Sequence, residues 1–338
     1  MSIAIDYQAI EPHLERLAAG GEGIVYRITN MPTHVFKEYK QLQQTALNID
    51  ALHDLIAVPT RLGASDRQRL ETRAAWPERV VVRNGRVIGF VMRSIPDAFY
   101  RRHGIHHSPR RVLLDWNQLI YQSQVLPATM VSEVPRLSHE QIITLLADLA
   151  QTMALLHDQD LVIGDISGKN LIWRTEPFEV LLIDCDSFRP ETGLGVCVHK
   201  ESPGWIDMSL GGGPTTKDSD VFKLGVAAYR ALWQDPNSVV VTDLVRPLSG
   251  SVPPAVIDLI GRSVGPTNRP TARQWVETLG NLYKYGGRPT INVPRPTATP
   301  VPSAAPIDPT PSPTPSPAGD TASPAAPARQ RPRLRVQR

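Results

Sequence analysis

The clearest hydrophobic pattern in the chain lies between residues 138 and 157, where apolar side chains recur every three or four positions. This period predicts an amphipathic helix. Ser138 stands just before it and Gln141 follows three residues later, which is the arrangement of a capping box. The apolar positions of the helix are Ile142, Leu145, Leu146, Leu149, Met153, Leu155 and Leu156.

Runs of β-branched residues predict strands before and after this helix. Residues 80–82 and 87–92 flank Asn84-Gly85, a strong hairpin signal. The glycine cluster 20–23 stands between apolar segments and predicts a strand, a turn and a strand. Further short apolar runs predict strands at 34–39, 161–163, 171–173 and 180–183.

Two other segments read as helices. Residues 41–56 carry apolar side chains at three- and four-residue steps. The longest apolar segment, 221–233, is interrupted by Lys223 and Arg230 and suits a buried helix rather than a membrane span. The stretch 97–135 gives no clear pattern, and its His-rich part fits a solvated loop better than a metal site.

The 338 residues are 41% hydrophobic and 20% charged, which suffices for a large core, but fourteen of the 32 prolines lie from Pro289 onward. Thr, Ala and Ser fill most of the remaining positions there. Such a composition buries too little apolar surface to offset chain entropy, so we expect 292–338 to be disordered.

The net charge is +3, and the last ten residues hold five arginines, so the rest of the chain is close to neutral. The Arg-rich end could bind an acidic partner or remain solvated. Cys185 and Cys197 are the only cysteines, which excludes a disulfide framework and fits a reducing compartment. Without a leader pattern or a long apolar run, we expect a cytoplasmic protein without a membrane span.

Three polar residues have the spacing of a phosphoryl-transfer site. Asp165 is followed five positions later by Asn170, and Asp184 closes the apolar run 180–183. Carboxylate and amide oxygens of this kind ligate Mg²⁺ beside a carboxylate that orients a hydroxyl. The pattern resembles the catalytic loop and the metal-binding Asp of protein kinases.

The resemblance extends along about residues 14–285 and implies an α+β, bilobal protein kinase-like fold. It implies a small β-rich lobe at 1–95, a larger and mostly helical lobe at 96–287, and a disordered tail at 288–338. A further helix at 272–283 would follow Asn268-Arg269-Pro270-Thr271, which is similar to a turn of the family.

The resemblance also implies an ATP site. The glycine turn, with Gly20, Gly21, Gly23 and Val25, would cover the nucleotide, because glycines permit positive φ and a close approach to phosphate oxygens. Lys37 would pair with the phosphates. The adenine would bind at a hinge that begins at Met92.

Other assignments follow from the same resemblance. A helix acid should pair with Lys37, and Asp50, Asp54 and Glu71 are the candidates. Asp220 would bind the backbone of the catalytic loop. Asp207 would stand opposite Arg269 in place of the family's Glu.

The chain also departs from the family pattern around Asp165 and Asp184. Ser167 occupies the usual lysine position, and Lys169, two residues later, would either reach the γ-phosphate or point to solvent. Gly164 takes the place of an arginine, so switching by loop phosphorylation is not expected. Asp186 would add a carboxylate near the metal or cap the next turn.

The resemblance thus implies a protein kinase that transfers the γ-phosphate of ATP to Ser or Thr hydroxyls of a protein, with Mg²⁺ or Mn²⁺. Asp165, Lys37 and Lys169 would be catalytic, and Asn170 and Asp184 would ligate the metal. Two alternatives stay open: a pseudokinase scaffold that binds nucleotide without turnover, and a small-molecule phosphotransferase of the aminoglycoside kinase type. The sequence gives neither the substrate nor the oligomeric state.

Overall fold

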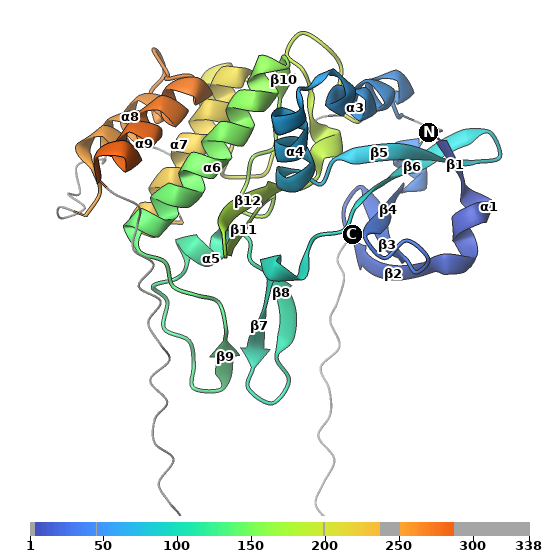
Figure 1. Ribbon diagram of the computed structural model, residues 1–338, viewed down its shortest axis with the longest axis horizontal. Coiled ribbons are helices and arrows are strands. Elements are labelled where there is room, and N and C mark those ends of the chain that lie inside the picture. Colours follow the sequence, from blue (N-terminus) through green and yellow to red (C-terminus); the bar gives the residue numbers. More distant parts are fainter. Residues whose placement is uncertain (1–3, 45, 199, 237–250, 287–338) are drawn as a thin grey trace, which may run out of the picture. The chain divides into compact units, whose positions relative to one another are not determined.

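A large sheet and a group of packed helices make up most of the computed structural model, which describes residues 4–44, 46–198, 200–236 and 251–286 (Figure 1). These residues belong to one compact unit, Met1–Thr290. The secondary structure is mixed α and β, as the α+β class requires. The predicted tail, 288–338, lies outside the described residues.

Six strands form the main sheet, in the order β1-β5-β6-β4-β3-β2. All neighbours pair antiparallel except β1, which runs parallel to β5. The short helix α1 (Tyr7–Ile10) and the 3-10 turn η1 (Glu11–His13) connect β1 to β2. The strands are β1 (Ala4–Asp6), β2 (Leu14–Ala19), β3 (Gly23–Ile28), β4 (His34–Tyr39), β5 (Pro77–Arg83) and β6 (Arg86–Arg93).

The predicted hairpin is confirmed, with Asn84 and Gly85 as the turn between β5 and β6. Both residues have positive φ, 52° and 73°, which is the conformation that Asn-Gly supplies at low cost in a two-residue hairpin. The strand–turn–strand prediction around 20–23 and the strand at 34–39 are confirmed as well.

The prediction of a single helix at 41–56 is wrong. The structure has a short helix α2 (Gln41–Gln44) and a separate helix α3 (Ile49–Arg61). Asn48 ends the continuity because its side chain accepts a hydrogen bond from the Ala51 amide, as an N-cap does. Helix α4 (Ala64–Arg73) then leads back to β5.

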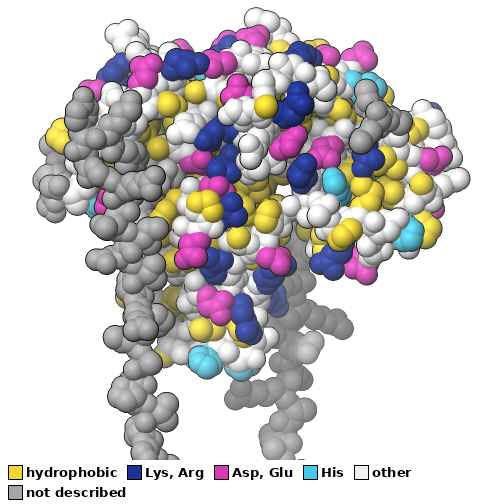
Figure 2. All heavy atoms as spheres, in the orientation of Figure 1, with side chains coloured by type: hydrophobic (Ala, Val, Ile, Leu, Met, Phe, Trp, Pro, Cys, Tyr) yellow, Lys and Arg dark blue, Asp and Glu magenta, His cyan; other side chains and the backbone are white. Residues whose placement is uncertain are grey.

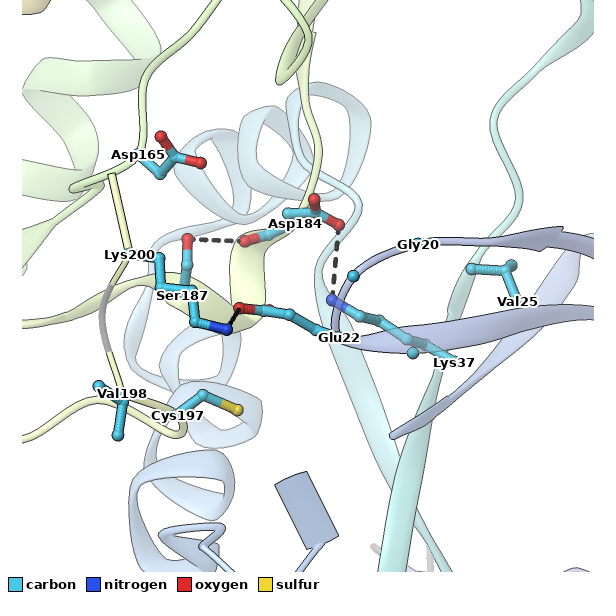
Figure 3. Close-up of a pocket in the computed structure, with 12 residues that line it drawn as sticks. Gly20, Glu22, Val25, Lys37, Asp165, Asp184, Ser187, Cys197, Val198 and Lys200 are labelled. Atoms are coloured by element: carbon cyan, nitrogen blue, oxygen red, sulfur yellow. Dashed lines mark hydrogen bonds and ion pairs between the residues drawn. The ribbon is translucent and has the colours of Figure 1, made fainter. Parts of the chain in front are cut away.

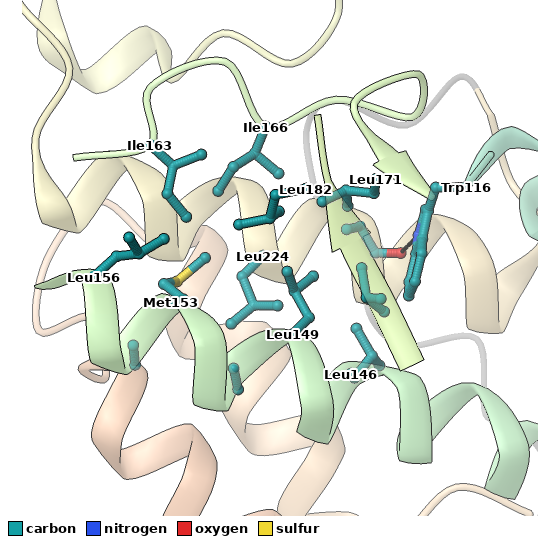
Figure 4. Packing of buried hydrophobic residues seen from close by; sticks show 14 of the residues in the cluster. Trp116, Leu146, Leu149, Met153, Leu156, Ile163, Ile166, Leu171, Leu182 and Leu224 are labelled. Atoms are coloured by element: carbon teal, nitrogen blue, oxygen red, sulfur yellow. Dashed lines mark hydrogen bonds between the residues drawn. The ribbon is translucent and has the colours of Figure 1, made fainter. Parts of the chain in front are cut away.

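The predicted central helix is α6 (His139–Asp158), and its capping box is present: Ser138 accepts from the Gln141 amide and Gln141 accepts from the Ser138 amide. Its apolar face packs with α9 (Ala272–Gly286) and α7 (Lys217–Trp233), and α8 (Pro254–Val264) packs on α7. Figure 4 shows Leu149 and Met153 of α6 packing beside Leu224 of α7.

Two pairs of short strands position the loops that carry Asp165 and Asp184. β11 (Leu171–Thr175) pairs with β12 (Phe178–Leu182), and β10 (Leu161–Val162) pairs with β13 (Arg189–Pro190). The loop from β10 to β11 carries Asp165, and the 3-10 turn η3 (Cys185–Ser187) follows β12.

The stretch 97–135 contains a three-stranded sheet that the sequence did not predict, while His106 and His107 lie exposed in a turn, as expected of a solvated loop. The order of the sheet is β8-β7-β9, from β7 (Tyr100–Ile105), β8 (Arg110–Leu113) and β9 (Met130–Ser132). The 3-10 turn η2 (Asp97–Phe99) precedes it and the short helix α5 (Asn117–Ile120) lies between β8 and β9.

One apolar cluster extends from the sheet to the helices. Tyr39 and Phe90 of the sheet, Leu52 and Leu55 of α3, and Leu146 of α6 all belong to it. A smaller cluster is formed by Ile10, Ile28, Phe36, Val81, Ile88 and Val91.

Lys and Arg side chains alternate with Asp and Glu side chains over the face seen in Figure 2, in keeping with the small net charge. Among the described residues, no helix combines the length and the apolar character needed to cross a bilayer.

Candidate functional site

A cavity of about 160 Å³ lies under the glycine turn between β2 and β3 (Figure 3). Lys37 of β4, Asp165 of the loop after β10 and Asp184 at the end of β12 line the same space. The remaining lining residues are Gly20, Gly21, Glu22, Gly23, Val25, Ser187, Cys197, Val198 and Lys200.

A second cavity, of about 370 Å³, adjoins the first, since Val25 and Asp184 line both. Its walls are largely apolar and include Met92, the residue predicted to begin the hinge. A cavity with both apolar and polar walls could take a flat heterocycle that carries polar groups. Its polar lining residues are Arg27, His34, Arg93, Ser94, Asp97, Tyr100, Arg111 and Asp184. The other apolar residues of its wall are Leu17, Ala18, Pro32, Val35, Ala75, Ile95, Leu113 and Ile183.

Lys37 is held by two carboxylates of the turn after β12. Its Nζ lies 2.7 Å from Oδ1 and 2.9 Å from Oδ2 of Asp186, and 3.4 Å from Oδ1 of Asp184. Burial favours the neutral amine, but the negative charges of Asp186 and Asp184 outweigh it and raise the pKa of Lys37. Lys37 is therefore a fixed positive charge at the floor of the cavity.

The Asp186 carboxylate is 2% exposed and accepts a third hydrogen bond, from the Tyr39 hydroxyl at 2.9 Å. Burial, and then the charge of Asp186, raise the pKa of Tyr39 well above its ordinary value, so the phenol stays a donor. Both oxygens of Asp186 therefore accept hydrogen bonds, and its charge is paired inside the protein.

The helix acids expected to pair with Lys37 do not do so. Asp50 and Asp54 are exposed and line a different cavity, beside Phe188. Glu71 on α4 forms an ion pair with Arg93 at 3.6 Å. The prediction is wrong because Asp186, in the turn η3 after β12, pairs with Lys37 instead. Asp186 also neither caps the turn after β12 nor lines the cavity.

Asp184 has left-handed backbone angles, φ 56° and ψ 40°. Such a conformation costs energy in a residue with a Cβ and is commonest where a side chain has to be aimed at a site. The Asp184 side chain is 55% exposed and lines the cavity, while its carbonyl oxygen accepts a hydrogen bond from the Ser187 hydroxyl at 2.8 Å. Its carboxylate is therefore open to a ligand.

Asp165 and Asn170 are in direct contact, as their spacing suggested. The Asn170 amide nitrogen donates to Asp165 Oδ2 at 2.9 Å and to its carbonyl oxygen at 2.8 Å. This leaves the amide oxygen of Asn170 as the group that could hold a cation. The Ile183 amide donates to the Asn170 carbonyl at 3.1 Å, which places Asn170 beside Asp184.

Lys169 is not brought to the cavity. Its side chain is exposed, it is absent from the lining of both cavities, and its charge lowers the pKa of Asp115, although burial raises that pKa overall. The reason is the turn before it: Trp116 donates to the Gly168 carbonyl, which fixes this part of the loop toward residues 115–117.

The three glycines of the turn line the cavity as predicted, but none of them has positive φ. Gly23 is required by a close approach instead, since a Cβ there would lie 2.6 Å from the Glu38 carbonyl oxygen. A Cβ at Gly20 or Gly21 would meet no atom closer than 4.0 Å, so these two glycines leave room above Lys37.

Asp220 of α7 binds the backbone of the loop, as the resemblance implied. It accepts from the Ile163 amide at 2.7 Å and from the Gly164 amide at 2.8 Å. Gly164 has φ 78°, a left-handed conformation that explains a glycine where the family has an arginine.

Arg269 and Asp207 form a buried ion pair through two hydrogen bonds, one of them 3.1 Å between Nη2 and Oδ1. Although burial raises it, hydrogen bonds from Arg269 and Ser209 lower the pKa of Asp207 overall. The pair lies away from the cavity and joins the segment before α7 to the turn before α9.

The donors present suit Mg²⁺ held together with phosphate oxygens. Among the described residues, no group of three or more His, Cys, Asp and Glu side chains forms a metal site. Mg²⁺ is commonly bound by one or two protein oxygens plus phosphates and water, and Asp184 with Asn170 could supply these. Lys37 and the glycine turn could hold the phosphates.

Several residues of the site had no assigned contact in the sequence analysis. Cys197 lines the cavity as a free thiol, and Glu22 of the glycine turn forms an ion pair with Lys200 at 3.9 Å across its mouth. Neither has a sequence signal, because both contacts join segments that lie far apart in the chain. For Lys223, a buried lysine on α7, the sequence signal was its place within the apolar run 221–233, which indicated a buried helix but no partner.

No model of a known protein family matches this chain, and no curated protein matches it. The function therefore has to be inferred from the side chains that the fold brings together.

Proposed function

We propose that the chain is an ATP- and Mg²⁺-dependent phosphotransferase with a bilobal protein kinase-like fold, and that it phosphorylates Ser or Thr hydroxyls of a protein in the cytoplasm. The observation that carries the proposal is the convergence of Lys37, Asp165 and Asp184 on one cavity under a glycine turn. These residues are 128 and 19 positions apart in the chain.

Each side chain has a role that its contacts support. Asp165 would orient the acceptor hydroxyl and take up its proton, because its carboxylate faces the cavity and is fixed by Asn170. Lys37, kept protonated by Asp186, would hold phosphate oxygens beneath the glycine turn. The apolar cavity beside Met92 would take the adenine ring.

Asp184 and Asn170 would hold the metal ion. Bound Mg²⁺ neutralises charge on the phosphoryl group during its transfer. Asp184 suits this role because its carboxylate is open to the cavity and its strained backbone is held by the turn η3.

The proposal is tested by incubating the purified full chain with labelled ATP, Mg²⁺ or Mn²⁺ and a generic protein acceptor. We expect transfer by the wild type and none by Asp184→Asn, with unchanged unfolding midpoints. Asp50→Asn, at an exposed carboxylate away from the cavity, is the matched control and should transfer normally. Wild-type-like turnover by Asp184→Asn would refute the metal assignment.

One observation favours the second candidate, a scaffold that binds nucleotide without turnover. Both oxygens of Asp165 accept hydrogen bonds from within the chain, from Ser202 and Asn170. A nucleotide-dependent rise in the unfolding midpoint together with no transfer to any acceptor would favour the scaffold.

A further inference from the structure

Lys223 on α7 is fully buried, yet it carries a charge. Its Nζ donates to the carbonyl oxygen of Gly164 and forms an ion pair with Glu201. Burying an ammonium group costs free energy, and apolar side chains of similar size would stabilise the same place as well or better. The position therefore calls for an explanation beyond the stability of the fold.

The two partners of Lys223 directly precede Asp165 and Ser202, which are hydrogen-bonded to each other. Gly164 precedes Asp165, and Glu201 precedes Ser202. The Ser202 amide lies 2.8 Å from Asp165 Oδ1, and the Ser202 hydroxyl lies 3.2 Å from Oδ2. Lys223 thus joins the loop that carries the carboxylate to the segment that binds it.

Asp220 lies three residues before Lys223 and so on the same face of α7. Its carboxylate accepts a hydrogen bond from the Gly164 amide at 2.8 Å, while Lys223 donates to the Gly164 carbonyl oxygen. Both backbone polar groups of Gly164 are therefore bound by one helix. This fixes the backbone from which the Asp165 side chain extends.

The hydrogen bonds to Asp165 leave room for one more donor. An ionised carboxylate offers about four acceptor positions. Ser202 uses one on each oxygen, and Asn170 uses another on Oδ2. The remaining position is on Oδ1, and its direction depends on where Ser202 is held.

We infer that Lys223 and Glu201 are positioning residues for phosphate transfer. They hold Gly164 and Ser202 so that Asp165 presents its one free acceptor position to the incoming hydroxyl. The inference rests on the proposed function. Because the ion pair of Glu201 with Lys223 needs no added phosphate, the segment is held without phosphorylation, in keeping with the glycine at position 164.

The test uses the full chain in three variants. Lys223→Met/Glu201→Leu replaces the ion pair with apolar side chains, so that no buried charge is left unpaired. Lys223→Arg keeps the charge. Lys217→Met is the matched control: it removes a lysine of the same helix that pairs with Asp160 at 2.6 Å and Glu191 at 3.3 Å instead.

We expect the double variant to lower kcat about 100-fold, the loss that a misplacement of about 1 Å causes, with KM for ATP within about twofold. Lys223→Arg should recover most of kcat, and Lys217→Met should match the wild type. A double variant with wild-type kcat, or one whose KM for ATP rises in step with the loss of kcat, would overturn the inference.

If the wild type itself transfers no phosphate, the proposed function fails. The hold of Lys223 and Glu201 on the segment with Ser202 is then tested by amide hydrogen exchange. The Ser202 amide should then exchange at least about tenfold faster in the double variant than in Lys217→Met. Equal protection of this amide in the two variants would show that Lys223 and Glu201 do not hold the segment, whatever the chain catalyses.

Discussion

Lys37 and Asp186 form a buried ion pair that joins the six-stranded sheet to the turn after β12, with Nζ 2.7 Å and 2.9 Å from the two carboxylate oxygens. Their side chains are 7% and 2% exposed. Because Tyr39 also donates to Asp186, the pair is satisfied on both sides. Asp186 thus occupies the role that sequence reasoning gave to an acid on a helix.

Removing the Asp186 charge should harm both stability and nucleotide binding. Asp186→Asn leaves Lys37 buried without its closest counter-charge, and breaking such a pair costs about 3–5 kcal/mol. We expect this loss in the free energy of unfolding, measured by urea titration, and a weaker nucleotide-dependent thermal shift. Glu71→Gln, which breaks only an exposed pair with Arg93, should change stability by about 1 kcal/mol or less.

A second prediction concerns Gly89, which pairs with Glu38 in the β4–β6 ladder. A Cβ at this position would lie 2.0 Å from the Lys37 carbonyl oxygen, so the strands would have to separate. We expect Gly89→Ala to cost about 1–3 kcal/mol in urea unfolding. Gly280→Ala, on α9 with no atom within 4 Å of the added methyl, should instead leave stability unchanged or raise it by up to about 1 kcal/mol.

The thiol of Cys197 should react slowly near neutral pH. Burial, and then the charges of Asp186 and Glu22, raise its pKa to about 12, so the thiolate is scarce below that pH. We expect alkylation by iodoacetamide at pH 8 about a hundredfold slower than for free cysteine, and a rate that still rises with pH above 9. The Cys197→Ser variant shows which part of the alkylation comes from Cys197 and which from Cys185. A rate that levels off near pH 9 would contradict the assignment.

The Asp207–Arg269 pair should make the free energy of unfolding depend on pH in the acidic range. Asp207 has its pKa lowered from 3.8 in the folded state, so the carboxylate stabilises the fold above pH 3.8 and loses this effect as pH falls through the lower folded value. Breaking the pair by Asp207→Asn should cost about 3–5 kcal/mol at pH 7. The difference between wild type and variant, from urea titrations, should shrink below about pH 4; a difference that stays constant to pH 3 would argue against it.

The elements that sequence predicts well here are those fixed by neighbours in the chain. The capping box of Ser138 and the hairpin turn at Asn84-Gly85 each depend on a few consecutive residues, and both are present. The five-residue spacing of Asp165 and Asn170 likewise limits how far apart they can lie; the sequence predicted them as members of one site, and the structure adds the hydrogen bond between them.

What could not be predicted depends on contacts between distant segments. The partner of Lys37 is 149 positions away and competes with acids that look better placed on a helix. The break at Asn48 is a single side-chain hydrogen bond that interrupts an otherwise helical pattern. The sheet at 100–132 pairs strands whose arginines and histidines hide the alternation of apolar and polar positions.

The spacing of Asp184 and Asp186 within one tight turn couples the positions of the two carboxylates. A rotation of this turn that withdrew the first carboxylate would also pull the second away from its ammonium partner in the sheet. Such an arrangement would leave an interior charge without its partner, at a large cost in free energy. The interior ion pair therefore anchors the turn in the conformation that keeps the Asp184 side chain in the cavity.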